Sequence, residues 1–246
     1  MKRIALIVFR CLLILPFWMA RVKTYYRNRD SVSLQKRYDF ICGVDRRLLK
    51  TGRIDVVASG MENLPEEQGY LLTPNHQGFA DPLAIFASHQ NIYKGVVKKE
   101  LVNAPLIGKV IKMLEYTPID RQDNRKAVKT IKSVSEELEA GINYLVFPEG
   151  TRSRKGNEIN EFKWGTFKMA TVAKAPIVPV AIVDSFKVFE SNNIKKTTVY
   201  LKYLEPIRFE EYQDLKTNEL ALEVEKRVKL GIEELIKLRD GKTSKD

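Results

Sequence analysis

The chain has 246 residues, of which 44% are hydrophobic and 9% aromatic, enough for an ordinary globular core, and this composition excludes an intrinsically disordered protein. Its 42 basic and 31 acidic residues give a net charge of +11, which favours anionic partners such as nucleic acid, anionic lipid or a phosphorylated substrate. The two cysteines, Cys11 and Cys42, form no disulfide framework and no metal-binding pair, so we expect a reducing compartment.

The N-terminal end holds both the charge excess and the most apolar segment. Residues 1–55 contain thirteen basic and four acidic residues, so nine of the eleven net charges lie there. Residues 4–20 contain a single charge, Arg10, and Pro16 should kink a helix formed by them. A straight helix of this length would be about 25 Å long, shorter than the ~30 Å hydrocarbon core of a bilayer.

A helix over residues 4–20 would lie in the membrane interface. Arg3, Arg10 and Arg21 fall on one side of a helical wheel, where they could meet headgroups. The acyl layer would then receive Leu12, Leu13, Leu15 and Trp18. Residues 31–50 have the pattern of a second helix, so residues 1–51 are predicted to form a membrane-associated two-helix arm. A span with Arg10 snorkelling, a cleaved signal peptide and a soluble core helix remain alternatives.

Residues 52–246 show apolar runs that alternate with helical segments. The predicted strands are residues 53–60, 69–73, 91–99, 115–119, 143–148, 176–183 and 197–204. The predicted helices are residues 82–88, 101–114, which is broken, 123–140 and 218–238. This alternation predicts an α/β fold with a mostly parallel central sheet flanked by helices.

The segment NHQGFADP (75–82) holds one of only two histidines in the chain. Asp81 followed by Pro82 is a typical helix start, and in that interpretation Asp81 is an N-cap and His76 an ordinary loop residue. The alternative is that His76 acts as a general base while Asp81 accepts a hydrogen bond from its second ring nitrogen. The loop could bring these side chains together because Gly78 lets it fold back.

Other common catalytic motifs are absent from the sequence. It has no GxSxG elbow, no HExxH or Cys/His cluster, and no GxxxxGK[ST] or GxGxxG loop. We therefore expect no bound metal or cofactor. The role left for a histidine base is to activate a hydroxyl of the substrate, without a covalent enzyme intermediate.

Two further loops carry arginines at the ends of predicted strands. PIDR (118–121) places Arg121 in one loop, and FPEGTRSR (147–154) follows a buried strand. The second loop presents Glu149, Gly150, Thr151 and Arg152. Because ligands bind at the carboxyl ends of strands in open α/β sheets, and arginine suits phosphate, we expect a phosphate site here. The alternative for each arginine is a solvated surface charge.

Four ordered blocks resemble those of the glycerolipid acyltransferases, most closely the bacterial 1-acyl-sn-glycerol-3-phosphate acyltransferases. NHQGFADP resembles the H-x4-D block of that family, and residues 98–121 resemble the second block. FPEGTRS and APIVPVAI resemble the third and fourth. The blocks cover residues 75–182, under half of the chain. FPEGTRS is the most specific of them.

The resemblance implies transfer of a fatty acyl group from an acyl-CoA or acyl-carrier-protein thioester to the sn-2 hydroxyl of lysophosphatidic acid. It implies His76 as base, assisted by Asp81, and a membrane location on the cytoplasmic face, in bacteria the inner membrane. It implies acceptor binding by the residues Arg121, Glu149, Gly150, Thr151 and Arg152. Contacts to the acyl donor or to phosphate are expected from Lys99, Asn75 and Pro179.

Several alternatives to this function stay open. Glycerol 3-phosphate or another lysolipid could be the acceptor, and a non-catalytic protein that binds anionic lipid is a different class. Nucleic-acid binding is disfavoured because the basic excess is interleaved with apolar residues and no nucleic-acid motif is present. The oxyanion donor is not identified, with a backbone N–H near Gly78 or Gly150 as the candidate.

Overall fold

The computed structural model describes residues 2–243, so Met1 and residues 244–246 lie outside the described residues. Seven strands form one sheet in the order β1-β7-β6-β2-β5-β3-β4. All neighbouring strands are parallel except β6 and β7. The strands are β1 Ile54–Ser59, β2 Leu71–Pro74, β3 Tyr93–Lys98, β4 Thr117–Ile119, β5 Asn143–Leu145, β6 Ile177–Val183 and β7 Thr197–Tyr203. The predicted α/β fold with a mostly parallel sheet is confirmed.

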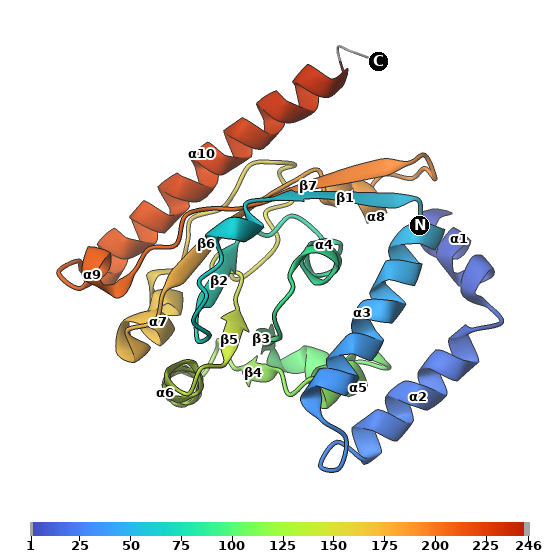
Figure 1. Ribbon diagram of the computed structural model, residues 1–246, viewed down its shortest axis with the longest axis horizontal. Helices are drawn as coiled ribbons and strands as arrows, with labels where there is room; N and C mark the ends of the chain where they lie inside the picture. Colours follow the sequence, from blue (N-terminus) through green and yellow to red (C-terminus); the bar gives the residue numbers. More distant parts are fainter. Residues whose placement is uncertain (1, 244–246) are drawn as a thin grey trace.

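Helices cover both faces of this twisted sheet (Figure 1). In the described residues they are α1 Lys2–Cys11, α2 Leu15–Arg27, α3 Leu34–Thr51, α4 Asp81–Ser88, α5 Ile107–Met113, α6 Asn124–Glu139, α7 Lys168–Ala173, α8 Phe186–Phe189, α9 Phe209–Tyr212 and α10 Thr217–Thr243. Short 3₁₀ turns are η1 Met61–Asn63, η2 Lys99–Asn103 and η3 Trp164–Phe167. One core lies under α6, α7 and α10, and the other under α3 and α4.

Strand β6 shows why the sheet needs both layers. All seven of its residues are buried, and successive side chains point to opposite faces. Ile177, Ala181 and Val183 join the core under α10, whereas Val178 and Ile182 join the core under α4. A continuous apolar run of this kind is typical of a strand that is covered on both sides.

The N-terminal arm differs from the expected two helices, because it is built of three. The first helix ends at Cys11, and Pro16 lies in the first turn of α2, where its missing N–H costs nothing. The bend expected from Pro16 is present as a full break in the turn before it. The axes of α1 and α2 meet at 84°. Among the described residues no single helix is long and apolar enough to cross a bilayer, and only this bent pair qualifies by length and composition when its halves are combined.

Of the three arginines predicted to meet headgroups, Arg10 and Arg21 are exposed, whereas Arg3 is buried. Arg3 is only 1% exposed, and its guanidinium donates to the carbonyl oxygens of Gly52 and Lys195, each at 2.7 Å, and to the hydroxyl of Thr197 at 2.6 Å. Arg10 donates to a backbone carbonyl of α3. The side of α1 that carries these two arginines therefore faces the protein. Unpaired carbonyls at a helix end and a strand start offer a buried guanidinium the partners it needs.

The apolar surface of the arm lies on the other side of α1 and at the bend. Leu12 and Leu13 are exposed, as expected, and Leu13 is 96% exposed. Trp18 is 8% exposed, because it packs with Ile7 and Cys11 in a small core between the helices. The large exposed apolar side chains of the arm are Ile4, Val8, Phe9, Leu12, Leu13, Phe17 and Met19.

The arm and the sheet share one core. Val22 and Tyr25 of α2, and Tyr38 and Ile41 of α3, belong to the same buried cluster as the residues of α4 and β2. A shared core marks no boundary between residues 1–51 and residues 52–246. The division of the chain into these two parts stays a prediction from sequence. The shared core holds the arm in a fixed position on the domain.

Asp45 of α3 generates a prediction about stability. It is 2% exposed, neither carboxylate oxygen has a hydrogen-bond partner, and burial, partly opposed by Arg46, raises its pKa to about 8. Its carboxyl takes up a proton more readily in the folded state than in the unfolded chain, where its pKa is about 3.9. Its contribution to stability is therefore fully present below about pH 4 and is lost as the pH rises through about 8.

Replacing this carboxyl by an amide should remove that pH dependence. The free energy of unfolding, measured with denaturant in detergent, should fall less between pH 5 and pH 8.5 for Asp45→Asn than for the wild type. Asp39→Asn, at an exposed position of the same helix, is the control and should follow the wild type. Parallel curves for all three proteins would contradict this account.

Candidate active site

A cavity of about 350 Å³ opens where three parallel strands end. The chain leaves β2 toward His76, β5 toward Phe147 and β3 toward Lys98, and all three residues line the cavity. Because the carboxyl ends of parallel strands meet at one edge of the sheet, loops that are distant in sequence converge there. The volume lies within the range of about 300–1,000 Å³ that is typical of ligand pockets.

His76 and Asp81 lie in direct contact at the edge of this cavity. The imidazole Nδ1 is 2.6 Å from Oδ2 of Asp81. The His76 side chain is 20% exposed, and Asp81 is fully buried. A carboxylate accepts at this distance, so Nδ1 carries the proton and donates it, which leaves Nε2 as the nitrogen that can accept a proton. The ring is also stacked on Phe147, with 4.0 Å between the ring centroids.

The carboxylate of Asp81 is held by four donors. Besides the imidazole, Oδ2 accepts from the backbone N–H groups of Gln77 at 2.7 Å and Gly78 at 3.0 Å, and Oδ1 accepts from the hydroxyl of Ser185. Asp81 is the first residue of α4, but it does not cap that helix, since it accepts from residues before it. Three N–H or O–H donors from the protein stabilise the ionised form and fix the carboxylate against the histidine.

The second histidine has a structural environment. His89 is 5% exposed, its Nδ1 donates to the carbonyl of Asn91 at 2.7 Å, and its Nε2 accepts from the hydroxyl of Tyr70 at 3.0 Å. Burial lowers its pKa to about 4. Both ring nitrogens are therefore occupied, and His76 is the imidazole available for chemistry in the described residues.

Glu149 lies behind the histidine instead of in the cavity. It is 1% exposed, and its two carboxylate oxygens accept from the backbone N–H groups of His76 at 2.6 Å and Asn160 at 2.8 Å. The N–H of Ser153 donates in turn to the carbonyl of His76 at 2.8 Å. The loop after β5 thus holds the backbone of His76 from both sides. Burial raises the pKa of Glu149, and the two backbone hydrogen bonds oppose this shift.

Cationic side chains surround the mouth of the cavity. Arg121, Arg152 and Lys98 all line it, and Arg121 donates to the carbonyl of Gly150. Gly150 has a φ of 72°, a left-handed conformation that favours glycine, and it turns this carbonyl toward the arginine. Thr151 lines the cavity as well. The interior beyond the histidine is apolar and is formed by the side chains of Tyr93, Val96, Tyr116, Leu145 and Phe147.

Arg152 is held in place by two contacts. Its guanidinium lies 4.0 Å from the ring centroid of Phe79, and one of its nitrogens is 3.8 Å from a carboxylate oxygen of Glu190. Its side chain remains 23% exposed. Such a guanidinium keeps donors for an anion at the cavity mouth.

Three residues expected to contact donor or phosphate lie away from the cavity lining. Asn75 is fully buried and bridges to Ile182 in β6, accepting from its N–H at 2.7 Å and donating to its carbonyl at 3.0 Å. Pro179 is buried within β6. Lys99 pairs with Asp120 at 2.7 Å, and its neighbour Lys98 takes the place in the cavity wall.

Sequence reasoning missed the residues that support the pair. Ser185 follows β6 and comes from 104 residues beyond Asp81, and Gln77 links the two by accepting from the N–H of Ser185 at 3.1 Å. No local pattern predicts that these two residues support Asp81, because Ser185 is distant from Gln77 and Asp81 in the chain. Phe147 was part of a recognised block, but its stacking on the imidazole depends on the two strands being neighbours.

The backbone groups suggested as oxyanion donors are already engaged. The N–H of Gly78 donates to Asp81, and that of Gly150 donates to the carbonyl of Phe147 at 3.0 Å. The glycine N–H groups themselves are therefore not available, and the expectation of a donor near Gly78 or Gly150 stays a prediction for their neighbours. Turns need these hydrogen bonds for their own geometry, which the presence of a glycine alone does not reveal.

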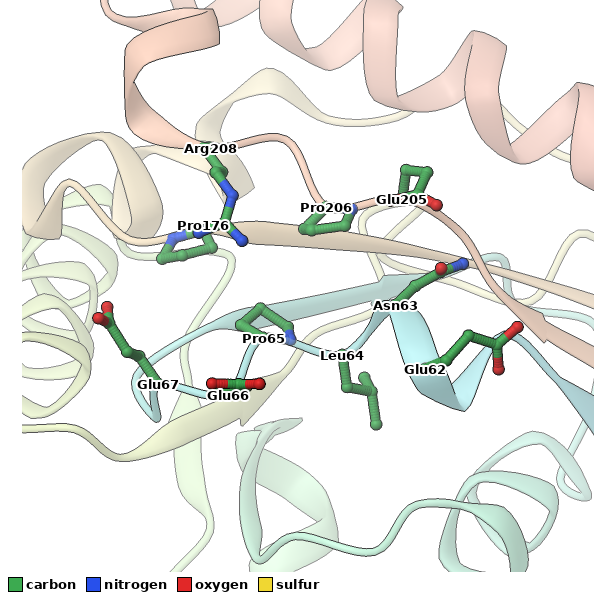
Figure 2. Close-up of a pocket in the computed structure, with 10 residues that line it drawn as sticks. All are labelled: Glu62, Asn63, Leu64, Pro65, Glu66, Glu67, Pro176, Glu205, Pro206 and Arg208. Carbon is green, nitrogen blue, oxygen red and sulfur yellow. The ribbon is translucent and has the colours of Figure 1, made fainter.

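A second cavity, of about 480 Å³, lies at the opposite edge of the sheet, before β2 and after β7 (Figure 2). Its polar lining is dominated by the carboxylates of Glu62, Glu66, Glu67 and Glu205, with Arg208 as the one basic side chain. Four carboxylates disfavour a phosphorylated ligand. The cationic cavity at His76 is therefore the candidate site.

Comparison with known proteins assigns the chain to a family. The family model described as Acyltransferase matches residues 55–183, which include His76, Asp81, Arg121 and the loop after β5. This match covers more than half of the chain, and the chain belongs to the Acyltransferase family.

Two similar proteins carry the same enzyme name. A chloroplast 1-acyl-sn-glycerol-3-phosphate acyltransferase of Brassica napus is 32% identical over 135 residues, which are 54% of this chain and 39% of the relative. The 1-acyl-sn-glycerol-3-phosphate acyltransferase of Salmonella typhimurium is 32% identical over 165 residues, which are 61% of this chain and 67% of the relative. The matches to plant chloroplast relatives thus span well under half the length of those proteins.

A solved structure matches nearly the whole chain. The crystal structure of the 1-acyl-sn-glycerophosphate (LPA) acyltransferase PlsC from Thermotoga maritima aligns with a TM-score of 0.70 and 25% identity. The alignment covers 96% of this chain and 98% of that one. The N-terminal helices are therefore included in the shared fold.

The position of Glu149 leads to a prediction. Glu149→Gln supplies only one acceptor oxygen, so one of two buried backbone N–H groups loses its partner. We expect a loss of about 1–3 kcal/mol in the free energy of unfolding and a lower kcat with little change in the acceptor KM. Denaturant unfolding and steady-state kinetics measure both. The exposed Glu161→Gln is the control, and a rise in acceptor KM alone would instead indicate direct substrate binding.

Proposed function

We propose that the protein transfers a fatty acyl group from a thioester donor to the sn-2 hydroxyl of 1-acyl-glycerol 3-phosphate, forming phosphatidic acid. The observation that carries this proposal is the contact of His76 with Asp81 at a cavity whose interior is apolar and whose mouth is cationic. Such a cavity suits an amphiphile with an anionic headgroup. Membership of the Acyltransferase family and the activities named for the relatives support the reaction class.

The chemistry begins with proton transfer from the acceptor. Nε2 of His76 removes the proton from the sn-2 hydroxyl as that oxygen attacks the carbonyl carbon of the thioester. Asp81 stabilises the imidazolium that forms. When the tetrahedral intermediate collapses, the C–S bond breaks and His76 returns the proton to the departing thiolate. General base catalysis contributes about 10²–10⁴-fold to such a rate.

The remaining rate enhancement depends on orientation and on charge stabilisation. Arg121 and Arg152 hold the acceptor phosphate at the cavity mouth, and the acyl chain lies along the apolar interior. The backbone N–H groups of Thr151 and Arg152 donate no hydrogen bond that the described residues show, and both residues line the cavity. We assign them as the donors to the developing oxyanion.

The arm supports a position on a membrane. Apolar side chains are exposed along α1 and at its bend into α2, and the basic residues of α2 include Arg21, Lys23 and Arg27, which are exposed. An apolar side with cations beside it is typical of a helix pair in a leaflet of anionic lipid. We propose that the protein is seated in this way on the cytoplasmic face, where thioester donors are made.

The identity of the acceptor is tested by supplying candidates singly. Purified protein receives lysophosphatidic acid, glycerol 3-phosphate or another lysolipid with a thioester donor, and release of free thiol is followed. Thiol release with lysophosphatidic acid alone supports the proposal. Release only with another acceptor would change the assigned substrate, and no release with any would favour a non-catalytic lipid-binding protein.

Removing the base should abolish most of the activity. His76→Ala leaves the cavity open but removes the proton acceptor, so kcat should fall at least about 100-fold while the fold is retained. Thiol release and circular dichroism measure the two effects. His89→Asn is the control, because His89 is buried away from the cavity, and it should lower stability more than kcat. A near-normal rate for His76→Ala would end the proposal.

Removing the guanidinium of Arg152 at the cavity mouth should weaken binding of the acceptor. Arg152→Ala should raise the KM for lysophosphatidic acid about tenfold or more, because a hydrogen bond to a charged group contributes about 1.5–3 kcal/mol. It should leave the use of an uncharged monoacylglycerol unchanged. Arg154→Ala, two residues further on and exposed, is the matched control. An unchanged preference for the phosphorylated acceptor would remove this role from Arg152.

A further inference from the structure

An exposed tryptophan lies in the segment that follows the loop after β5. Trp164 begins the turn η3 and is 53% exposed, whereas tryptophan side chains are mostly buried. Nζ of Lys168 lies 5.1 Å from the centroid of its ring. Gly165, the next residue, faces open space, since a methyl group added there would have no neighbour within 4 Å. The backbone beside the indole is therefore not covered by other parts of the protein.

Lys163 connects this surface to the catalytic loop. Its backbone N–H donates to the carbonyl of Pro148 at 2.9 Å. A methyl group added at Gly150 would lie 3.3 Å from Nζ of Lys163, so the ammonium is beside the glycine that lines the cavity. Phe147, which stacks on the imidazole of His76, starts the same turn. Lys163 is therefore bound to the Phe147–Gly150 turn, which also carries the ring that stacks on His76.

The charges of this surface are available to a ligand. Neither Lys163 nor Lys168 forms an ion pair with any residue that the structure describes. Glu149 is engaged by backbone N–H groups, and Glu225 of α10, which accepts from the N–H of Phe162, pairs with Lys229. The exposed carboxylates nearby in the sequence are those of Glu158 and Glu161. Both ammonium groups lack an ion pair among the described residues, and that of Lys168 already contacts the ring of Trp164. Ammonium groups beside an exposed aromatic ring are features that bind a phosphorylated aromatic ligand.

We propose that Lys163, Trp164 and Lys168 bind the adenine nucleotide of a coenzyme A thioester. This inference rests on the proposed function and names the donor that the site accepts. The acyl chain enters the apolar cavity, the thioester lies at His76, and the nucleotide remains outside, past Gly150. The indole stacks on the adenine, and the two ammonium groups pair with its phosphates. Arg121 and Arg152 stay free for the acceptor.

An acidic carrier protein fits these residues less well. A single exposed indole with adjoining lysines instead matches one flat ring that carries phosphates. The carrier protein is therefore treated as an alternative outcome of the test.

The test compares two donors that differ only in the nucleotide. Trp164→Leu and Lys168→Ala are assayed with an acyl-CoA and with the matching acyl-4′-phosphopantetheine, which has the same reactive end. For Trp164→Leu the KM for acyl-CoA should rise about tenfold or more, as expected for a lost base–aromatic stack, whereas the KM for the truncated donor and both kcat values should not change. Trp164→Phe, which keeps an aromatic face, should restore most of the affinity.

Controls separate this inference from the proposed function. Lys216→Ala, an exposed lysine before α10, should affect neither donor. Adenosine 3′,5′-bisphosphate should bind to His76→Ala protein in a calorimetric titration and should fail to bind when Trp164→Leu is added, which needs no turnover. Equal effects on both donors, no effect on either, or an effect confined to acyl carrier protein would overturn the inference. Failure of wild-type protein with every donor would instead reject the proposed function.

Discussion

The buried carboxylate of Asp81 is the constraint on which the active site depends. A carboxylate with no exposed surface is costly unless its oxygens are satisfied, and here donors come from His76, Gln77, Gly78 and Ser185. To supply them, the loop after β2 has to close on itself and the end of β6 has to approach it. The orientation of the imidazole is therefore a consequence of satisfying one buried charge.

The loop after β5 also fixes the position of His76. The carboxylate of Glu149 and the N–H of Ser153 hold the backbone of His76 on both sides, so the loops after β2 and β5 behave as one unit. Parallel pairing of the two strands brings them to the same edge. The residues that touch the ligand can then differ in charge and polarity while the base stays in place. An apolar interior and a cationic mouth on either side of a fixed imidazole suit a substrate with a tail and a charged head.

The sequence was informative where periodicity or a motif was local. Every predicted strand is present, and the pairing of His76 with Asp81 followed from one short loop. The role of Glu149 could not be predicted, because a carboxylate in a loop of a ligand-binding motif gives no sign that its partners are backbone N–H groups. The supporting Ser185 lies 104 residues from Asp81 and has no marker in its neighbourhood.

The N-terminal arm shows a second limit of prediction from sequence. A helical wheel shows which residues share a face, but it does not show whether that face meets lipid or the protein. Arg3 and Trp18 were placed toward the membrane, yet both are buried against the domain. The helix breaks in the turn before Pro16, where this residue can donate no hydrogen bond to the carbonyl of Leu12, and the packing of α1 and α2 against α3 accompanies the break.

The attachment of Arg3 has a consequence for how the protein works on a lipid surface. Its guanidinium joins the first helix to the beginnings of β1 and β7, so the helix cannot tilt without pulling on the sheet. If that helix is seated in a leaflet as proposed, this attachment fixes the height of the imidazole above the acyl chains. The depth of seating would then set how far along a lipid headgroup the catalytic nitrogen can reach.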